Sequence, residues 1–232
     1  MKDLKGSPLD LRPRPKISFL QSLIMSTETE KAGAPPDDVG LTSIPANESH
    51  EFKELTVSKS GVMGNLKICP AGSQTATFFI DVSFYTPSKA DITLHSGSDS
   101  RGKVVGVVDL KKFAGHYEVA IGDLSGKEEL VWEPLEVVQY WASRHGFEAE
   151  FGDQGVKEFI WRHPGERLSD HPGDMELVKE ENPDYVLAQY VKAGTHSWKS
   201  RGNLLIREGY GEEWELMVIL TALALVVVKS RR

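Results

Sequence analysis

The sequence predicts a mainly β domain, an antiparallel sandwich or barrel, that ends in a hydrophobic helix. From Glu51 onward, short apolar runs rich in β-branched and aromatic residues are separated by Gly, Pro, Asn and Asp about every eight to twelve positions, as in antiparallel β proteins. The last segment breaks this pattern, because Leu216 to Val228 is apolar except for Thr221. A helix that is apolar all round must be buried on every side, and amphipathic strands could cover it.

Residues 1–50 are expected to be a disordered tail in front of a domain at residues 51–232. Residues 1–16 are basic and interrupted by three prolines, and residues 26–49 are rich in Pro, Gly, Ser, Thr and acidic residues with few apolar anchors. Residues 1–25 loosely resemble a basic and apolar signal peptide, but no small-residue cleavage pattern follows. We therefore expect an intracellular protein, cytoplasmic or peripherally attached to a membrane. Met25, which opens an ordinary acidic stretch, is an alternative start.

Strands are expected along most of the domain. Cys69 stands at the end of one strand, before Pro70, and Gly152–Gly155 is the expected turn of a hairpin. The further expected strands are 75–86, 90–96, 103–110, 116–122, 147–151, 156–162, 175–180, 184–193 and 203–209. Residues 130–144 are ambiguous, with a strand expected up to Trp132 and a short helix after Pro134, because proline suits a first helical turn.

The C-terminal segment has three possible structures. Glutamates at its start (Glu212, Glu213, Glu215) and basic residues at its end (Lys229, Arg231, Arg232) match the dipole of a helix. At about 1.5 Å per residue, the apolar run 216–228 spans about 20 Å, less than the ~30 Å of a bilayer core. A helix surrounded by protein is therefore favoured over a tail anchor, and a final strand at Val226–Val228 is the third alternative.

Several short motifs occur in an order that resembles one family. They are Phe159-Ile160-Trp161, Val186-Leu187-Ala188, Gly202–Ile206 and the terminal apolar run. Residues 51–232 resemble the tubby C-terminal-like superfamily, which includes LURP-one-related proteins and phospholipid scramblases, and the last segment is most similar to fungal members. The resemblance implies a closed antiparallel β-barrel of about twelve strands around a central hydrophobic C-terminal α-helix. A barrel of that width needs a filled lumen, and a helix about 10 Å across fills it.

Composition and motifs argue against several functions. The net charge of −7 argues against broad nucleic-acid binding, and the single cysteine, Cys69, excludes an internal disulfide and a Cys-based zinc site. The phosphate-loop, dinucleotide-binding and G-x-S-x-G patterns do not occur. The Ser, His and Asp residues of 95–102 have the composition of a hairpin turn. We therefore expect no enzyme activity and no cofactor; a cryptic enzyme would need titratable groups that converge in a cleft.

A doubled tripeptide, His163-Pro164-Gly165 and His171-Pro172-Gly173, has acidic residues interspersed. Imidazoles and carboxylates could form a metal loop. The spacing fits no fixed metal motif, so a polar loop of X-Pro-Gly turns is favoured and no metal is expected. A scramblase-type calcium site is not expected either, because no EF-hand-like pattern occurs.

The family resemblance implies lipid head-group binding by a basic site on the outer barrel wall. The candidate residues are Trp198, Lys199 and Arg201, an aromatic with two cations that could meet a membrane interface and bind phosphate. The alternative is an ordinary turn with solvated charges. Lys111, Lys112, Lys157 and Arg162 are weaker candidates. The aromatics Phe78, Phe79, Phe84 and Tyr85 should point to both faces of a strand, so that some mark a partner surface or a covering loop. The expected partner is an anionic phospholipid surface, including phosphoinositides, or another protein, without a transmembrane span.

Overall fold

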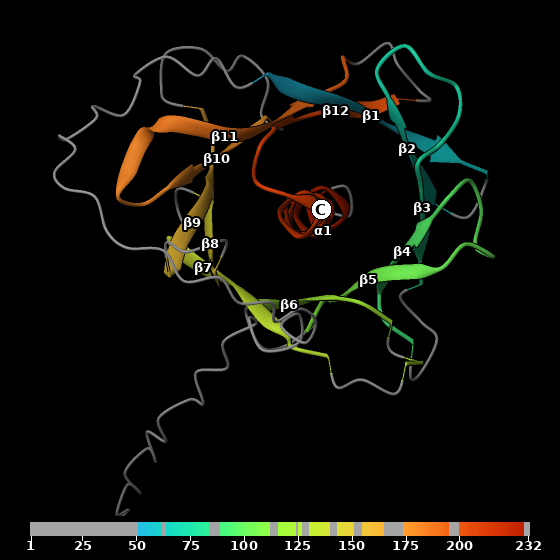
Figure 1. Ribbon diagram of the computed structural model, residues 1–232, viewed down its shortest axis with the longest axis horizontal. Helices are drawn as coiled ribbons and strands as arrows, with labels where there is room; N and C mark the ends of the chain where they lie inside the picture. Colours follow the sequence, from blue (N-terminus) through green and yellow to red (C-terminus); the bar gives the residue numbers. More distant parts are fainter. Residues whose placement is uncertain are drawn as a thin grey trace, which may run out of the picture. The chain divides into compact units, whose positions relative to one another are not determined.

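The computed structural model describes residues 51–61, 64–83, 89–111, 116–123, 125–126, 130–139, 143–150, 155–164, 174–194 and 200–229. These residues form twelve strands and one helix (Figure 1). The elements are β1 (Phe52–Ser60), β2 (Asn65–Pro70), β3 (Phe78–Val82), β4 (Ile92–Ser96), β5 (Val104–Asp109), β6 (His116–Ile121), β7 (Glu133–Gln139), β8 (Arg144–Glu150), β9 (Val156–Arg162), β10 (Met175–Lys179), β11 (Asn182–Lys192), β12 (Ser200–Arg207) and α1 (Glu212–Lys229).

The strands form a closed antiparallel barrel in which each strand pairs with its neighbours in the sequence. The barrel closes where β1 pairs with β12, with Phe52 opposite Arg207 and Val57 opposite Gly202. The expected hairpin is present, because Glu150 at the end of β8 pairs with Val156 at the start of β9. The predicted closed antiparallel barrel of about twelve strands is therefore confirmed.

Helix α1 lies at the centre of the barrel, where the strands surround it (Figure 1). Twelve of its residues are buried, including the apolar side chains from Leu216 to Leu225. They pack against inward-facing strand residues such as Leu55, Ile80 and Leu135, in one continuous core. The central hydrophobic helix is thus confirmed, and Val226–Val228 continue the helix and do not form a strand. Within the described ranges, no helix combines the length and the apolarity that a membrane crossing requires.

Two details fit α1 to the barrel wall. Gly106 on β5 faces the helix, and a Cβ atom there would stand 2.5 Å from Leu220 Cδ1, so the helix approaches where a side chain is missing. Thr221, the polar residue within the apolar run, is fully buried. Its Oγ1 accepts a hydrogen bond from Trp161 Nε1 on β9 at 2.9 Å and donates one to the Met217 carbonyl at 2.8 Å.

One local prediction was wrong. Residues 133–139 form strand β7, where a short helix was expected after Pro134. Strands β6 and β8 both need a partner at this point of the closed sheet, and β7 pairs with both. Pro134, opposite Glu118, is the second residue of the strand. A missing amide proton is tolerated near the start of a strand, so tertiary pairing decides the conformation.

Other expectations were only partly met. β1 was not identified from the sequence, and β3 is shorter than the expected strand 75–86. Phe78 packs against the main core, whereas Phe79 is buried beside the His95 ring, at 6.2 Å between ring centroids. Phe84, Tyr85 and residues 1–50 lie outside the described residues.

Candidate functional site

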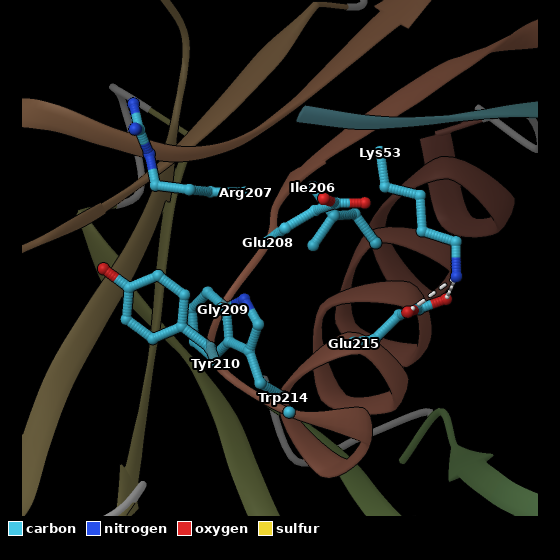
Figure 2. Close-up of a pocket in the computed structure, with 9 residues that line it drawn as sticks. Lys53, Ile206, Arg207, Glu208, Gly209, Tyr210, Trp214 and Glu215 are labelled. Carbon is cyan, nitrogen blue, oxygen red and sulfur yellow. Dashed lines mark hydrogen bonds and ion pairs between the residues drawn. The ribbon is translucent and has the colours of Figure 1, made fainter. Parts of the chain in front are cut away.

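A hollow of about 260 Å³ opens at the N-terminal end of α1 (Figure 2). Trp214 and Ile206, both nearly buried, contribute its apolar lining, and Tyr210 stands beside Trp214 with ring centroids 5.3 Å apart. Lys53 and Glu215 also line it, and their side chains contact each other. The volume lies just below the ~300–1,000 Å³ typical of small-molecule sites.

The charges around this hollow are engaged within the protein. Lys53 Nζ donates to both carboxylate oxygens of Glu215, at 2.7 and 2.8 Å, and thereby joins β1 to the first turn of α1. The Arg207 guanidinium lies over the rings of Phe52 and Tyr185, at 4.7 and 4.4 Å from their centroids. Its Nε donates to the Val186 carbonyl at 3.0 Å. These contacts order the strand ends, which is a structural role.

Tyr210 completes the lining of the hollow. Burial, together with a hydrogen bond to Tyr185, raises the pKa of Tyr210 to about 12. Its hydroxyl therefore keeps its proton at neutral pH and can act as a hydrogen-bond donor but not as a base. The described lining thus offers hydrogen bonds and aromatic surface.

The opposite end of the barrel, at the C-terminal end of α1, carries a cluster of cations. We call Lys192, Arg201 and Lys229 the basic rim. Lys192 is the last residue of β11 and pairs with Gly202, the residue that follows Arg201 on β12. Lys229 is the last residue of α1, and its proximity to Lys192 is great enough that the two charges repel. Lys192 and Lys229 therefore place like charges close together, and Arg201 lies on the strand that pairs with Lys192.

Neighbouring groups hold the basic rim in place. The His163 Nδ1–H donates to the Asp174 carbonyl at 2.8 Å, and Asp174 Oδ1 accepts the backbone N–H of Lys192 at 2.8 Å. The Tyr190 hydroxyl donates to the carbonyl of Arg201, also at 2.8 Å. Burial raises the pKa of Tyr190 to about 12, which keeps this donor protonated.

Lys229 is partly buried, whereas Lys192 is exposed. The Lys229 Nζ lies 3.4 Å from His163 Nε2. Burial disfavours the charged ammonium and lowers the pKa of Lys229, and the positive charge of Lys192 lowers this pKa further. An anion bound at the rim would relieve the repulsion between the two lysines.

Three of the four weaker candidate cations of the sequence form ion pairs with carboxylates. Lys111 pairs with Asp109 and Glu118, Lys157 with Glu181, and Arg162 with the nearly buried Glu176; Lys112 lies outside the described residues. By contrast, in the part of the chain that the structure describes, no ion pair joins Lys192, Arg201 or Lys229 to a carboxylate.

Of the three principal candidates, Arg201 lies in the basic rim, whereas Trp198 and Lys199 lie outside the described residues. Lys192 and Lys229 were not proposed from the sequence as binding residues. Lys229 was noted only as a cation at the end of the helix, and Lys192 does not belong to any motif that the sequence analysis identified. Their positions could have identified them, because Lys192 is the last residue of β11 and Lys229 is the last residue of α1, both beside the Ser200 end of β12.

The other sequence candidates have structural surroundings. His95 Nδ1 donates to the Gly102 carbonyl, and Asp99 pairs with Arg101, whose hydrogen bond lowers the pKa of Asp99, as in the expected turn. His171 and most of the doubled His-Pro-Gly segment lie outside the described residues. Among the residues that are described, no group of three or more His, Cys, Asp or Glu side chains could hold a metal ion.

Comparison with known proteins adds no identification: no protein-family model and no curated protein matches this chain.

Proposed function

We propose that this chain is a non-enzymatic binding module that attaches to anionic phospholipid surfaces through the basic rim. The observation that carries the proposal is the group of cations at the C-terminal end of α1, which have no carboxylate partner in the described structure, whereas Lys111, Lys157 and Arg162 are paired. Lysine and arginine side chains near an anionic membrane each contribute about 1 kcal/mol to binding.

The sequence places further suitable residues next to the same elements. Trp198 and Lys199 immediately precede β12, and Arg231 and Arg232 follow α1. Tryptophan is enriched at membrane interfaces, where its amphipathic ring fits the head-group region. This assignment retains the candidates chosen from the sequence and adds Lys192 and Lys229 to them.

The net charge of −7 requires that any such attraction be local. A local cationic site on an acidic protein must act within a screening length of about 10 Å at 0.1 M salt. Binding should therefore be strong at low ionic strength and fall steeply when salt is added.

Two features support a binding role without catalysis. The lumen, which holds ligands in open barrels, is occupied by α1. The hollow at the other end is small, and its charged lining residues Lys53 and Arg207 are held by protein contacts.

Co-sedimentation with vesicles tests this function. The full chain should bind phosphatidylserine-containing vesicles at low salt, and should not bind pure phosphatidylcholine vesicles. The double variant Lys192→Gln/Arg201→Gln should bind about 30-fold more weakly, the equivalent of two charges at about 1 kcal/mol each. The matched control is Lys103→Gln/Lys157→Gln, which removes the same charge at the opposite end of the barrel. The proposal fails if the intact chain does not bind at low salt, or if both double variants lose binding equally.

A further inference from the structure

Lys229 differs from the paired lysines of the described structure in what surrounds its amine. The ammonium groups of Lys53, Lys89, Lys111 and Lys157 each contact a carboxylate, which stabilises the protonated form. Lys229 has no such ion pair in the described residues, and its amine faces an imidazole nitrogen. Protonated amines are not nucleophiles, so this environment favours reaction at Lys229.

The tautomer of His163 is set by its other neighbour. The Asp174 carbonyl can only accept, so the proton of a neutral imidazole stands on Nδ1, which donates at 2.8 Å. Nε2 then carries a lone pair directed to the Lys229 amine at 3.4 Å. A histidine in this state can accept the proton that an amine loses when it attacks an electrophile.

The charged groups that face Lys229 come from several elements. Lys192 on β11 opposes a positive charge at this position. Asp174, which precedes β10, directs its carboxylate to the backbone of Lys192 and its carbonyl to His163. The cations Lys192 and Arg201 would attract a reagent that bears phosphate groups.

We infer that Lys229 is a lysine acylation site that takes its acyl group from a thioester with an anionic, phosphate-bearing carrier. The Lys229 nitrogen attacks the thioester carbonyl and forms a C–N bond, and the C–S bond then breaks. His163 Nε2 accepts the proton from the nitrogen and passes it to the leaving thiolate. The products are an amide on Lys229 and the free thiol of the carrier, so no oxidant or further reactant is required.

Acylation of Lys229 also provides a means of regulation that rests on the proposed membrane function. The amide is neutral, so the modified basic rim has one cation fewer. A loss of about 1 kcal/mol per charge near an anionic surface corresponds to roughly fivefold weaker binding. Acylation of Lys229 therefore weakens attachment of the chain to the membrane.

Acetyl-coenzyme A tests the reaction without lipid. The folded full-length chain is incubated with it at neutral pH, and the acetylation rate of each lysine is measured by peptide mass spectrometry. Lys229 should react several-fold faster than the exposed Lys59 and Lys103, and this preference should vanish in urea. The inference is overturned if Lys229 reacts no faster than these two lysines.

Two variants test the roles of the neighbours. His163→Asn retains a donor for the Asp174 carbonyl but removes the accepting nitrogen, and should slow acetylation of Lys229 while Lys59 is unaffected. Lys192→Gln, a change of an exposed side chain, should also slow it, because the remaining amine holds its proton more firmly. If Lys229 is acetylated at an unchanged rate in the folded variants, the mechanism is contradicted. If the His163→Asn variant does not fold, the acetylation rate of Lys229 in the Lys192→Gln variant serves as the test.

The regulatory consequence has its own readout. Lys229→Gln, which imitates the acylated side chain, should bind phosphatidylserine vesicles roughly fivefold more weakly than the unmodified chain. Equal binding overturns the regulation. If the unmodified chain does not bind vesicles at all, the proposed membrane function fails. The acetylation rates still test independently whether Lys229 is a modification site.

Discussion

Replacing Thr221 with valine removes the hydrogen bond between α1 and β9 with little change in volume. Trp161 and Thr221 are both fully buried, so the Trp161 Nε1–H loses its acceptor and cannot reach water. An unpaired buried donor costs about 1–3 kcal/mol. The Met217 carbonyl keeps the ordinary helical hydrogen bond, and valine and threonine have similar helix propensities, so no other large effect is expected.

The assay is urea unfolding followed by far-UV circular dichroism. We expect Thr221→Val to lower the free energy of unfolding by about 2 kcal/mol, or the melting temperature by about 4–8 °C for a domain of this size. Thr221→Ser keeps the hydroxyl oxygen and should lose less, about 1 kcal/mol for the missing methyl group.

A double-mutant cycle isolates the hydrogen bond. In a Trp161→Phe background there is no indole N–H to leave unpaired, so Thr221→Val should then have little effect. The coupling energy between the two positions should be about 1–2 kcal/mol. A coupling below about 0.5 kcal/mol would refute the reasoning, because that is the error expected of independent sites.

Two further predictions concern packing and charge. Gly106→Ala should destabilise the domain by about 1–3 kcal/mol in the same urea assay, because the new Cβ meets the fully buried Leu220. The control is Gly194→Ala, whose new Cβ enters open space and should change stability by less than about 0.5 kcal/mol. Partial desolvation and the nearby Glu180 charge raise the pKa of Glu158, so the folded state binds this proton more tightly than the unfolded state, and the contribution of Glu158 to stability falls as pH rises above about 4.5. Glu158→Gln should therefore raise the melting temperature at pH 7, with a gain that disappears below about pH 4; an equal gain at both pH values would show that charge is not the cause.

The fold was largely predictable from two local patterns. The period of two along strands such as β12, where Gly202, Leu204 and Ile206 are buried between half-exposed residues, is a property of a sheet with one covered face. The apolar run from Leu216 to Val228 has no polar face and is short for a bilayer, which favoured burial within the protein over a tail anchor. Together these patterns indicate a filled β structure, although barrel closure itself came from the family resemblance.

Where local signals conflicted with pairing, prediction failed. Pro134 indicated a helix start, but β6 and β8 require a strand between them. β1 was missed because charged residues such as Lys53, Glu54 and Lys59 obscure its buried Leu55 and Val57. Strand pairing depends on residues that are far apart in the sequence, so it cannot be predicted from local composition.

The candidate site was predictable only in part for the same reason. Arg201 was chosen because a cation stands near Trp198 in the sequence. Lys192 and Lys229 join it because α1 runs back through the barrel from the end of β12 and ends at the rim where β12 begins. His163 was noted as a possible metal ligand or turn residue, and its contact with Lys229 spans 66 positions of the chain.

The central claim is that α1 is the filling of the barrel, and deletion of residues 212–232 tests it most directly. The truncated chain exposes the inner faces of the strands, including Leu55, Ile80 and Leu135, which are fully buried in the intact domain. Circular dichroism and urea titration of this chain should show an aggregating protein with no cooperative transition, whereas deletion of residues 230–232 alone should leave the transition in place. A soluble chain ending at Gly211 that keeps the native β spectrum and unfolds cooperatively would contradict the account.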